Sequence, residues 1–165
     1  MKTADPAIPE VTATLSVIRR WLVIVLLVGL AGTVVELFLL KHTDGVSQLA
    51  PVVLMAVAIP ILGWSVWVRS FASVRVLQVV MALLVLCGVV GVILHFSGNL
   101  GYERESNPSL SGVELYRSAL LGSTPALAPG ALIPLGMIGL LLTFRHPALA
   151  RSKRGEDSPE TRNTP

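Results

Sequence analysis

The chain has 165 residues, of which 53% are hydrophobic and 14% are charged, and its mean hydropathy is +0.72. Soluble domains carry about a quarter charged residues, so this composition excludes an ordinary soluble domain and indicates a membrane protein. The net charge of +3 could suggest a nucleic-acid partner, but the basic residues lie at the ends of apolar runs, where orientation in a membrane explains them. We therefore expect the lipid bilayer as a partner and no nucleic acid.

Four apolar runs follow one another along the chain, and they predict membrane spans at residues 21–40, 49–68, 74–96 and 126–144. Runs of about 20 residues suffice to cross about 30 Å of hydrocarbon as helices. The first run is too long for a signal peptide and is not followed by a small-residue cleavage site, so we expect it to be retained. The expected fold class is all-α, an integral membrane four-helix bundle.

The remaining segments are more polar. Residues 1–17 are expected to form a flexible cytoplasmic leader, residues 18–145 the membrane domain and residues 146–165 a disordered cytoplasmic tail. The tail carries many charges and shows no apolar periodicity. The chain is therefore expected to contain one domain with two polar ends.

The long link between the third and fourth spans contains one segment with helical periodicity, residues 113–121. Ser111 and Glu114 have the spacing of a capping box at its start. The sequence thus predicts a short amphipathic helix in this link, lying on the outer membrane surface.

Lysine and arginine are distributed unequally between the two sides of the predicted bundle. Ten of the thirteen lie on the side of the chain ends, whereas Lys41, Arg104 and Arg117 lie on the other side. Because basic residues are enriched in cytoplasmic loops, both termini are expected in the cytoplasm. The predicted location is the cell membrane (plasma or inner membrane), with a multi-pass arrangement.

Several ionisable side chains lie close to the predicted outer surface. Glu36 is about one helical turn inside the end of the first span, where an ionised carboxylate is costly, and His95 lies at a similar depth in the third. Asn99 lies one turn above His95 if that helix continues, although Gly98 and Gly101 favour a bend. Glu103 and Glu105 would point the same way in an extended segment. The candidate outer pocket comprises Glu36, His42, Asp44, His95, Asn99, Glu103 and Glu105.

Carboxylate and imidazole groups together suit divalent cations such as zinc, iron or manganese, and the candidate ligands are His95, Glu36, His42 and Glu103. However, the sequence has none of the compact ligand spacings of known metal motifs. A haem held by His42 and His95 is a further alternative, although His42 lies beyond the helix end. The simpler expectation is no cofactor, with these groups bonding one another, lipid headgroups and the backbone of the link.

No residue pattern indicates catalysis. The sequence lacks the Gly-x-Ser-x-Gly nucleophile elbow, and the single cysteine, Cys87, lies in an apolar run without a charged neighbour that would favour a thiolate. We expect no catalytic residue, and the sequence favours a non-enzyme without deciding the question.

The leading functional hypothesis is a non-catalytic accessory or assembly subunit of a larger membrane complex, with other integral membrane subunits or further copies of the chain as partners. Small residues in the spans motivate it, since they let helices approach closely. Two alternatives are a metal- or haem-binding protein using the outer pocket and a proton-coupled carrier with Glu36 as the titrating group. The small residues are Gly29, Gly32, Thr33, Gly88, Gly91, Gly130, Gly136 and Gly139.

Overall fold

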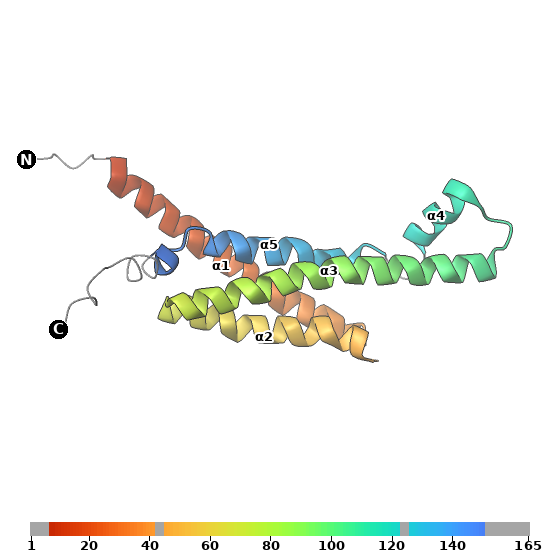
Figure 1. Cartoon of the computed structure of the whole chain (residues 1–165), viewed down its shortest axis with the longest axis horizontal. Coiled ribbons are helices and arrows are strands. Elements are labelled where there is room, and N and C mark those ends of the chain that lie inside the picture. Colours follow the sequence, from red (N-terminus) through yellow and green to blue (C-terminus); the bar gives the residue numbers. More distant parts are fainter. Residues whose placement is uncertain (1–6, 42–44, 123–125, 151–165) are drawn as a thin grey trace, which may run out of the picture.

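The computed structural model describes residues 7–41, 45–122 and 126–150. These residues are almost entirely helical and contain no strand, which confirms the predicted all-α class. The elements in chain order are α1 (Ala7–Leu39), α2 (Val46–Val68), α3 (Phe71–Ser106), α4 (Gly112–Leu121), the short 3₁₀ helix η1 (Ala128–Ala131) and α5 (Leu132–Thr143) (Figure 1).

Three of the described helices, α1, α2 and α3, are long and apolar enough to cross a membrane, which indicates a membrane protein. The fourth apolar stretch is shorter, because Ala128–Thr143 consists of η1 followed directly by α5. Proline at the second position of η1 and small residues around it account for the 3₁₀ geometry at this end.

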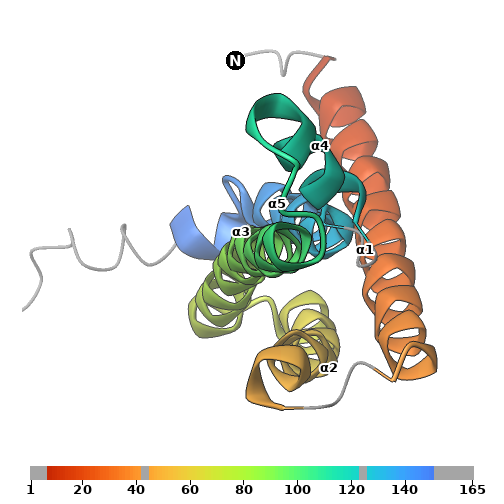
Figure 2. The ribbon, with the colours of Figure 1, turned by 90° about the vertical axis from the view of Figure 1, so that its right-hand side faces the viewer.

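The apolar helices α1, α2, α3 and α5 form the body of the molecule (Figures 1 and 2). α1 and α3 each pack against both α2 and α5, whereas no contact joins α1 to α3 within the described chain. The neighbours therefore follow one another in the order α1, α2, α3, α5. The buried side chains at the centre include Leu26, Leu30, Met55, Leu62, Leu77, Met81, Leu84 and Leu132.

Helices α3 and α5 approach each other closely, and this approach depends on glycines of both helices. A Cβ on Gly136 would lie 2.6 Å from the carbonyl oxygen of Met81, and a Cβ on Gly88 would lie 2.8 Å from Cγ1 of Ile133. Gly139 lies directly against the Met81 side chain. The small residues expected to favour close packing are thus used within the chain at this interface.

Hydroxyl groups inside the apolar helices bond to carbonyl groups of their own helix. Thr33 Oγ1 donates to the Gly29 carbonyl at 2.8 Å, Ser65 Oγ to the Leu62 carbonyl at 2.9 Å, and Thr143 Oγ1 to the Leu140 carbonyl at 2.8 Å. Each hydroxyl group thus finds its hydrogen-bond acceptor within its own helix and needs neither water nor a polar side chain of another helix.

Only two residues separate α2 from α3. Arg69 has a left-handed backbone with φ 49° and donates its N–H to the Ser65 carbonyl, which ends α2. Ser70 is the N-cap of α3 and forms a reciprocal capping box with Ser73. The turn is therefore fixed by backbone and side-chain bonds at both helix ends.

Two helices extend beyond the predicted bounds. α1 is helical from Ala7, within the stretch expected to be a flexible leader, because Pro9 falls in its first turn, where a missing N–H is harmless. α3 continues ten residues past Phe96 to Ser106, so Gly98 and Gly101 do not bend the chain. Of the expected tail, residues 147–150 are helical, and residues 151–165 lie outside the described part.

Candidate functional site

The end of α3 and the helix α4 form a hairpin that projects beyond the other helices (Figure 1). The link folds back so that α4 lies along α3, with Leu115 and Ala119 buried. The rings of Phe96 and Tyr116 are stacked, with centroids 6.3 Å apart. α4 confirms the predicted short helix, and its buried apolar residues face α3, whereas its position on the membrane surface stays a prediction.

Asn99 holds the two helices of this hairpin together. Its side chain is 4% exposed, and Nδ2 donates to the Ala119 carbonyl oxygen at 2.9 Å. Gly122 follows α4 and lies against the Asn99 side chain, where an added Cβ would come within 3.0 Å. The predicted position of Asn99 one turn after His95 is confirmed by the continuous helix. Asn99 therefore links α3 to α4 through a buried hydrogen bond.

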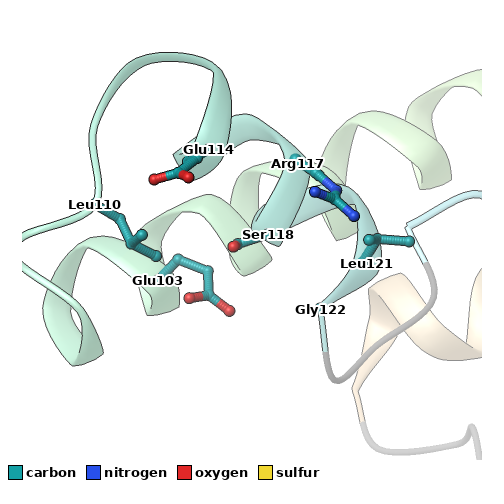
Figure 3. Close-up of a pocket in the computed structure, with 7 residues that line it drawn as sticks. All are labelled: Glu103, Leu110, Glu114, Arg117, Ser118, Leu121 and Gly122. Atoms are coloured by element: carbon teal, nitrogen blue, oxygen red, sulfur yellow. The ribbon is translucent and has the colours of Figure 1, made fainter.

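A cleft of about 610 Å³ lies between α3 and α4 (Figure 3). Glu103 lines it from α3, while Glu114, Arg117 and Ser118 line it from α4. Leu110, Leu121 and Gly122 complete the lining. The cleft is open to its surroundings, and Figure 3 shows the Glu103 side chain on α3 and the Glu114 and Arg117 side chains on α4.

The carboxylate of Glu103 is positioned by Asn107, whose Nδ2 donates to Glu103 Oε2 at 2.9 Å. The Asn107 N–H also donates to the Glu103 carbonyl at 2.8 Å, which ends α3. The cleft therefore presents two carboxylates, one guanidinium and one hydroxyl group. Such a lining suits hydrogen bonding and ion pairing with a polar group from the aqueous phase.

The backbone entry into α4 differs from the predicted capping box. Ser111 is the N-cap, but its side chain makes no capping hydrogen bond. Gly112 has φ 56°, a left-handed conformation that glycine adopts at low cost. The chain enters α4 through this backbone turn and not through the two hydrogen bonds of the predicted capping box. The helix was predicted correctly, whereas its capping box was not.

The seven residues of the predicted outer pocket have different surroundings. Glu36 is exposed on α1, while His95 is half-buried on α3, and no Cα atoms of these two helices lie within 8 Å of each other in the described chain. Glu103 is half-buried in the cleft and Glu105 is exposed. Because the segment is helical, side chains two positions apart point in different directions. His42 and Asp44 lie outside the described residues.

No group of three or more His, Cys, Asp or Glu side chains that could hold a metal ion occurs among the described residues. The predicted ligand set of Glu36, His42, His95 and Glu103 includes one residue outside this part of the chain and therefore stays a prediction.

The chain was also compared with known proteins. No protein-family model, no curated protein sequence and no solved structure matches it.

Sequence reasoning identified Glu103 but missed the other polar residues of the cleft. Glu114 and Ser118 are four residues apart, and Arg117 lies beside them on the helix predicted for residues 113–121. Their spacing was a usable signal, since residues i and i+4 share a face of a helix. The missing information was that α3 continues far enough to lie opposite this face.

Proposed function

We propose that this chain is a small, non-catalytic, multi-pass membrane protein that serves as an accessory or assembly subunit of a larger membrane complex. Three long apolar helices support insertion into a membrane. The stretch Ala128–Thr143 supports a fourth crossing, because four 3₁₀ residues and twelve α-helical residues together reach about 26 Å. This approaches the hydrocarbon thickness of about 30 Å.

The proposed orientation has both termini in the cytoplasm and the α3–α4 hairpin outside. The distribution of lysine and arginine described above supports it, and the cell (plasma or inner) membrane is the proposed location. An even number of crossings is consistent with the two chain ends lying on the same side.

The observation that supports a partner most directly is the outward face of α1. Only 11% of the residues in its most apolar stretch are buried inside the chain, against 28% in α2 and in α3. Leu26 and Leu30 point inward, and Glu36 is exposed within the predicted span. Charged residues in spans normally face protein or a water-filled cavity rather than acyl chains. A partner helix on this face would shield the carboxylate.

Gly32 lies four residues before Glu36 and is also exposed. A Cβ built on Gly32 meets nothing within 4 Å, in contrast to Gly29, which lies against Leu135 of α5. Gly32 therefore has no packing role in the described chain and leaves room for the close approach of another helix. Glu36 and Gly32 together define the proposed partner face.

The two alternatives also stay predictions. A metal- or haem-binding role would require His42 to approach His95 or Glu36. A proton-coupled carrier would require Glu36 to line a pathway, and the position of Glu36 on the outward face of α1 gives this reading no additional support.

The test is purification of the tagged chain from its own cells at native abundance in a mild detergent, followed by measurement of the particle mass. The expected result is a complex that is lost or strongly reduced in Gly32→Leu and Glu36→Leu variants. Gly98→Leu is the matched control, because a Cβ on Gly98 also meets nothing within 4 Å. A monomer without partners in the unmodified chain would overturn the proposal.

A further inference from the structure

An apolar groove of about 510 Å³ runs between α1 and α2 on the outside of the bundle. Val23 and Leu27 line it from α1, and Ile59, Leu62, Gly63, Val66 and Trp67 line it from α2. The α2 residues of the lining extend over about 12 Å of helix. Trp67 is 91% exposed at one end, and a Cβ on Gly63 would meet nothing within 4 Å.

Positive charge gathers at the end of the groove where Val23 and Val66 lie. Arg19 precedes Val23 by four residues and so lies on the same face of α1, while Arg69 ends α2 three residues after Val66. The Arg69 guanidinium is held by a bond from its Nε to the Val66 carbonyl at 3.0 Å. The two helices are antiparallel, so both arginines occupy the same end.

His146 brings a third basic group to this end from the segment after α5. Burial lowers the pKa of His146, and the charges of Arg19 and Arg69 lower it further, which places both arginines within electrostatic reach of the imidazole. Its Nδ1 accepts a hydrogen bond from the Ala148 N–H at 3.2 Å. Three separate segments thus bring basic side chains to one location.

We propose that this groove and its basic end bind one anionic phospholipid, with an acyl chain between α1 and α2 and the phosphate group at Arg19 and Arg69. Charge complementarity argues for this occupant, because a phosphate can pair with the guanidinium groups at the basic end of the groove. The groove is apolar along its length and basic at one end, which matches the two parts of a phospholipid. Trp67 lines the groove two residues before Arg69, and tryptophan is enriched at the level of the lipid headgroups in membrane proteins.

This inference goes beyond the accessory role and requires only that α1 and α2 lie in a membrane. The groove is lined by Val23 and Leu27, whereas the proposed partner face contains Gly32 and Glu36. Variants of one surface therefore leave the other unchanged, and the two proposals can fail separately.

The test measures quenching of Trp67 fluorescence by phospholipids that carry brominated acyl chains, in a chain whose other two tryptophans, Trp21 and Trp64, are replaced by phenylalanine. The chain is reconstituted in unbrominated phosphatidylcholine vesicles, and brominated phosphatidylglycerol or brominated phosphatidylcholine is titrated in. The expected result is quenching at a lower mole fraction of phosphatidylglycerol than of phosphatidylcholine. Soluble glycerophosphate should not compete, since it lacks an acyl chain.

Three variants separate the two parts of the site. Arg19→Gln and Arg69→Gln should each weaken the preference for phosphatidylglycerol roughly fivefold, the effect of one basic residue near a membrane surface. Gly63→Leu should fill the groove and weaken quenching by both lipids equally. Arg20→Gln is the matched control, because Arg20 is the neighbouring exposed arginine of α1 and does not contribute to the lowered pKa of His146.

Equal quenching by the two lipids in the unmodified groove would overturn the proposal. So would quenching that persists unchanged in Gly63→Leu, or a protein partner that is displaced by Gly63→Leu. Correct folding of each variant is checked by its helical circular dichroism, and the arginine variants provide an independent measurement if Gly63→Leu does not fold.

Discussion

Three basic residues share an unusual backbone conformation at the ends of apolar helices. Lys41, Arg69 and Arg145 have φ values of 52°, 49° and 47°, and they are the non-glycine residues with positive φ in the described chain. They follow the last turns of α1, α2 and α5 respectively. Glycine is the usual residue at such positions, but a cation also interacts favourably with the negative end of the helix dipole. At the end of each of these helices, one residue therefore provides both the left-handed backbone turn that ends the helix and a positive charge near its C-terminus.

The lowered pKa of His146 leads to a prediction about pH. The folded chain binds a proton at His146 less readily than the unfolded chain, whose histidine has its ordinary pKa of 6.5. The contribution of neutral His146 to the stability of the fold is therefore complete at a pH above the ordinary histidine pKa. It is lost as the pH falls through the lower pKa of His146 in the folded chain. The melting temperature in detergent should fall on acidification from about pH 7.5 to about pH 5, and it should fall less in His146→Gln.

The matched variant is Arg19→Gln, which removes one of the two charges that depress this pKa. Titration of the His146 ring by NMR should show its pKa moving upward in this variant. A pKa at or above the ordinary histidine value in the unmodified chain would contradict the explanation.

Asn99 carries a second prediction at the scale of one side chain. Asn99→Ala removes the donor to the Ala119 carbonyl and leaves space at the contact between α3 and α4. The expected loss is about 1–3 kcal/mol of the free energy that holds α4 in place. Faster hydrogen exchange in the amides of α4 would show this, whereas the exposed Asn107→Ala should have little effect. Unchanged exchange would mean that apolar contacts alone hold α4.

Among the elements, α3 and α5 form the interface least able to accept larger residues. In Gly136→Ala the new methyl group would meet the Met81 carbonyl oxygen at 2.6 Å and Cγ2 of Val85 at 2.7 Å. Because backbone cannot move aside as a flexible side chain can, the change should destabilise the bundle by about 1–3 kcal/mol. Thermal unfolding in detergent measures this loss.

Gly98→Ala is the opposite case on α3, because its Cβ meets open space. Alanine favours a helix over glycine by about 1 kcal/mol, so this variant should be neutral or more stable. Equal destabilisation by both substitutions would contradict the explanation from the α3–α5 contact, because Gly98 takes no part in that contact.

Elements with long apolar runs could be predicted from the sequence, whereas the contacts between them could not. Hydropathy located α1, α2 and α3, and periodicity located α4. The end of α3 was missed because Gly98 and Gly101 are weak helix formers, whereas in the structure α4 packs against this part of α3 and Asn99 bonds the two helices together. The cleft residues Glu114 and Ser118 were missed for the same reason, since they become a site only beside the extended α3.

At the scale of the whole molecule, the proposed topology places both termini in the cytoplasm and the α3–α4 hairpin outside, and reporter fusions can test it. A reporter enzyme that is active only outside the cytoplasm should be active when inserted at Gly112, and a reporter that works only inside should work when fused at the C-terminus. Exchanged reporter activities would reverse the orientation, and a result that places both sites in the same compartment would rule out the single crossing by Ala128–Thr143 that is proposed between them.

The length of α3 has a practical consequence. The ten residues after Phe96 raise the hairpin about 15 Å above the predicted bilayer boundary, with Asn107 and Pro108 at its tip. The connection at this tip is solvent-exposed, so an epitope inserted there should leave the packed core undisturbed. In the proposed orientation, an antibody would then recognise the chain on intact cells, and water-soluble compounds would reach the Glu103 cleft without entering the bilayer.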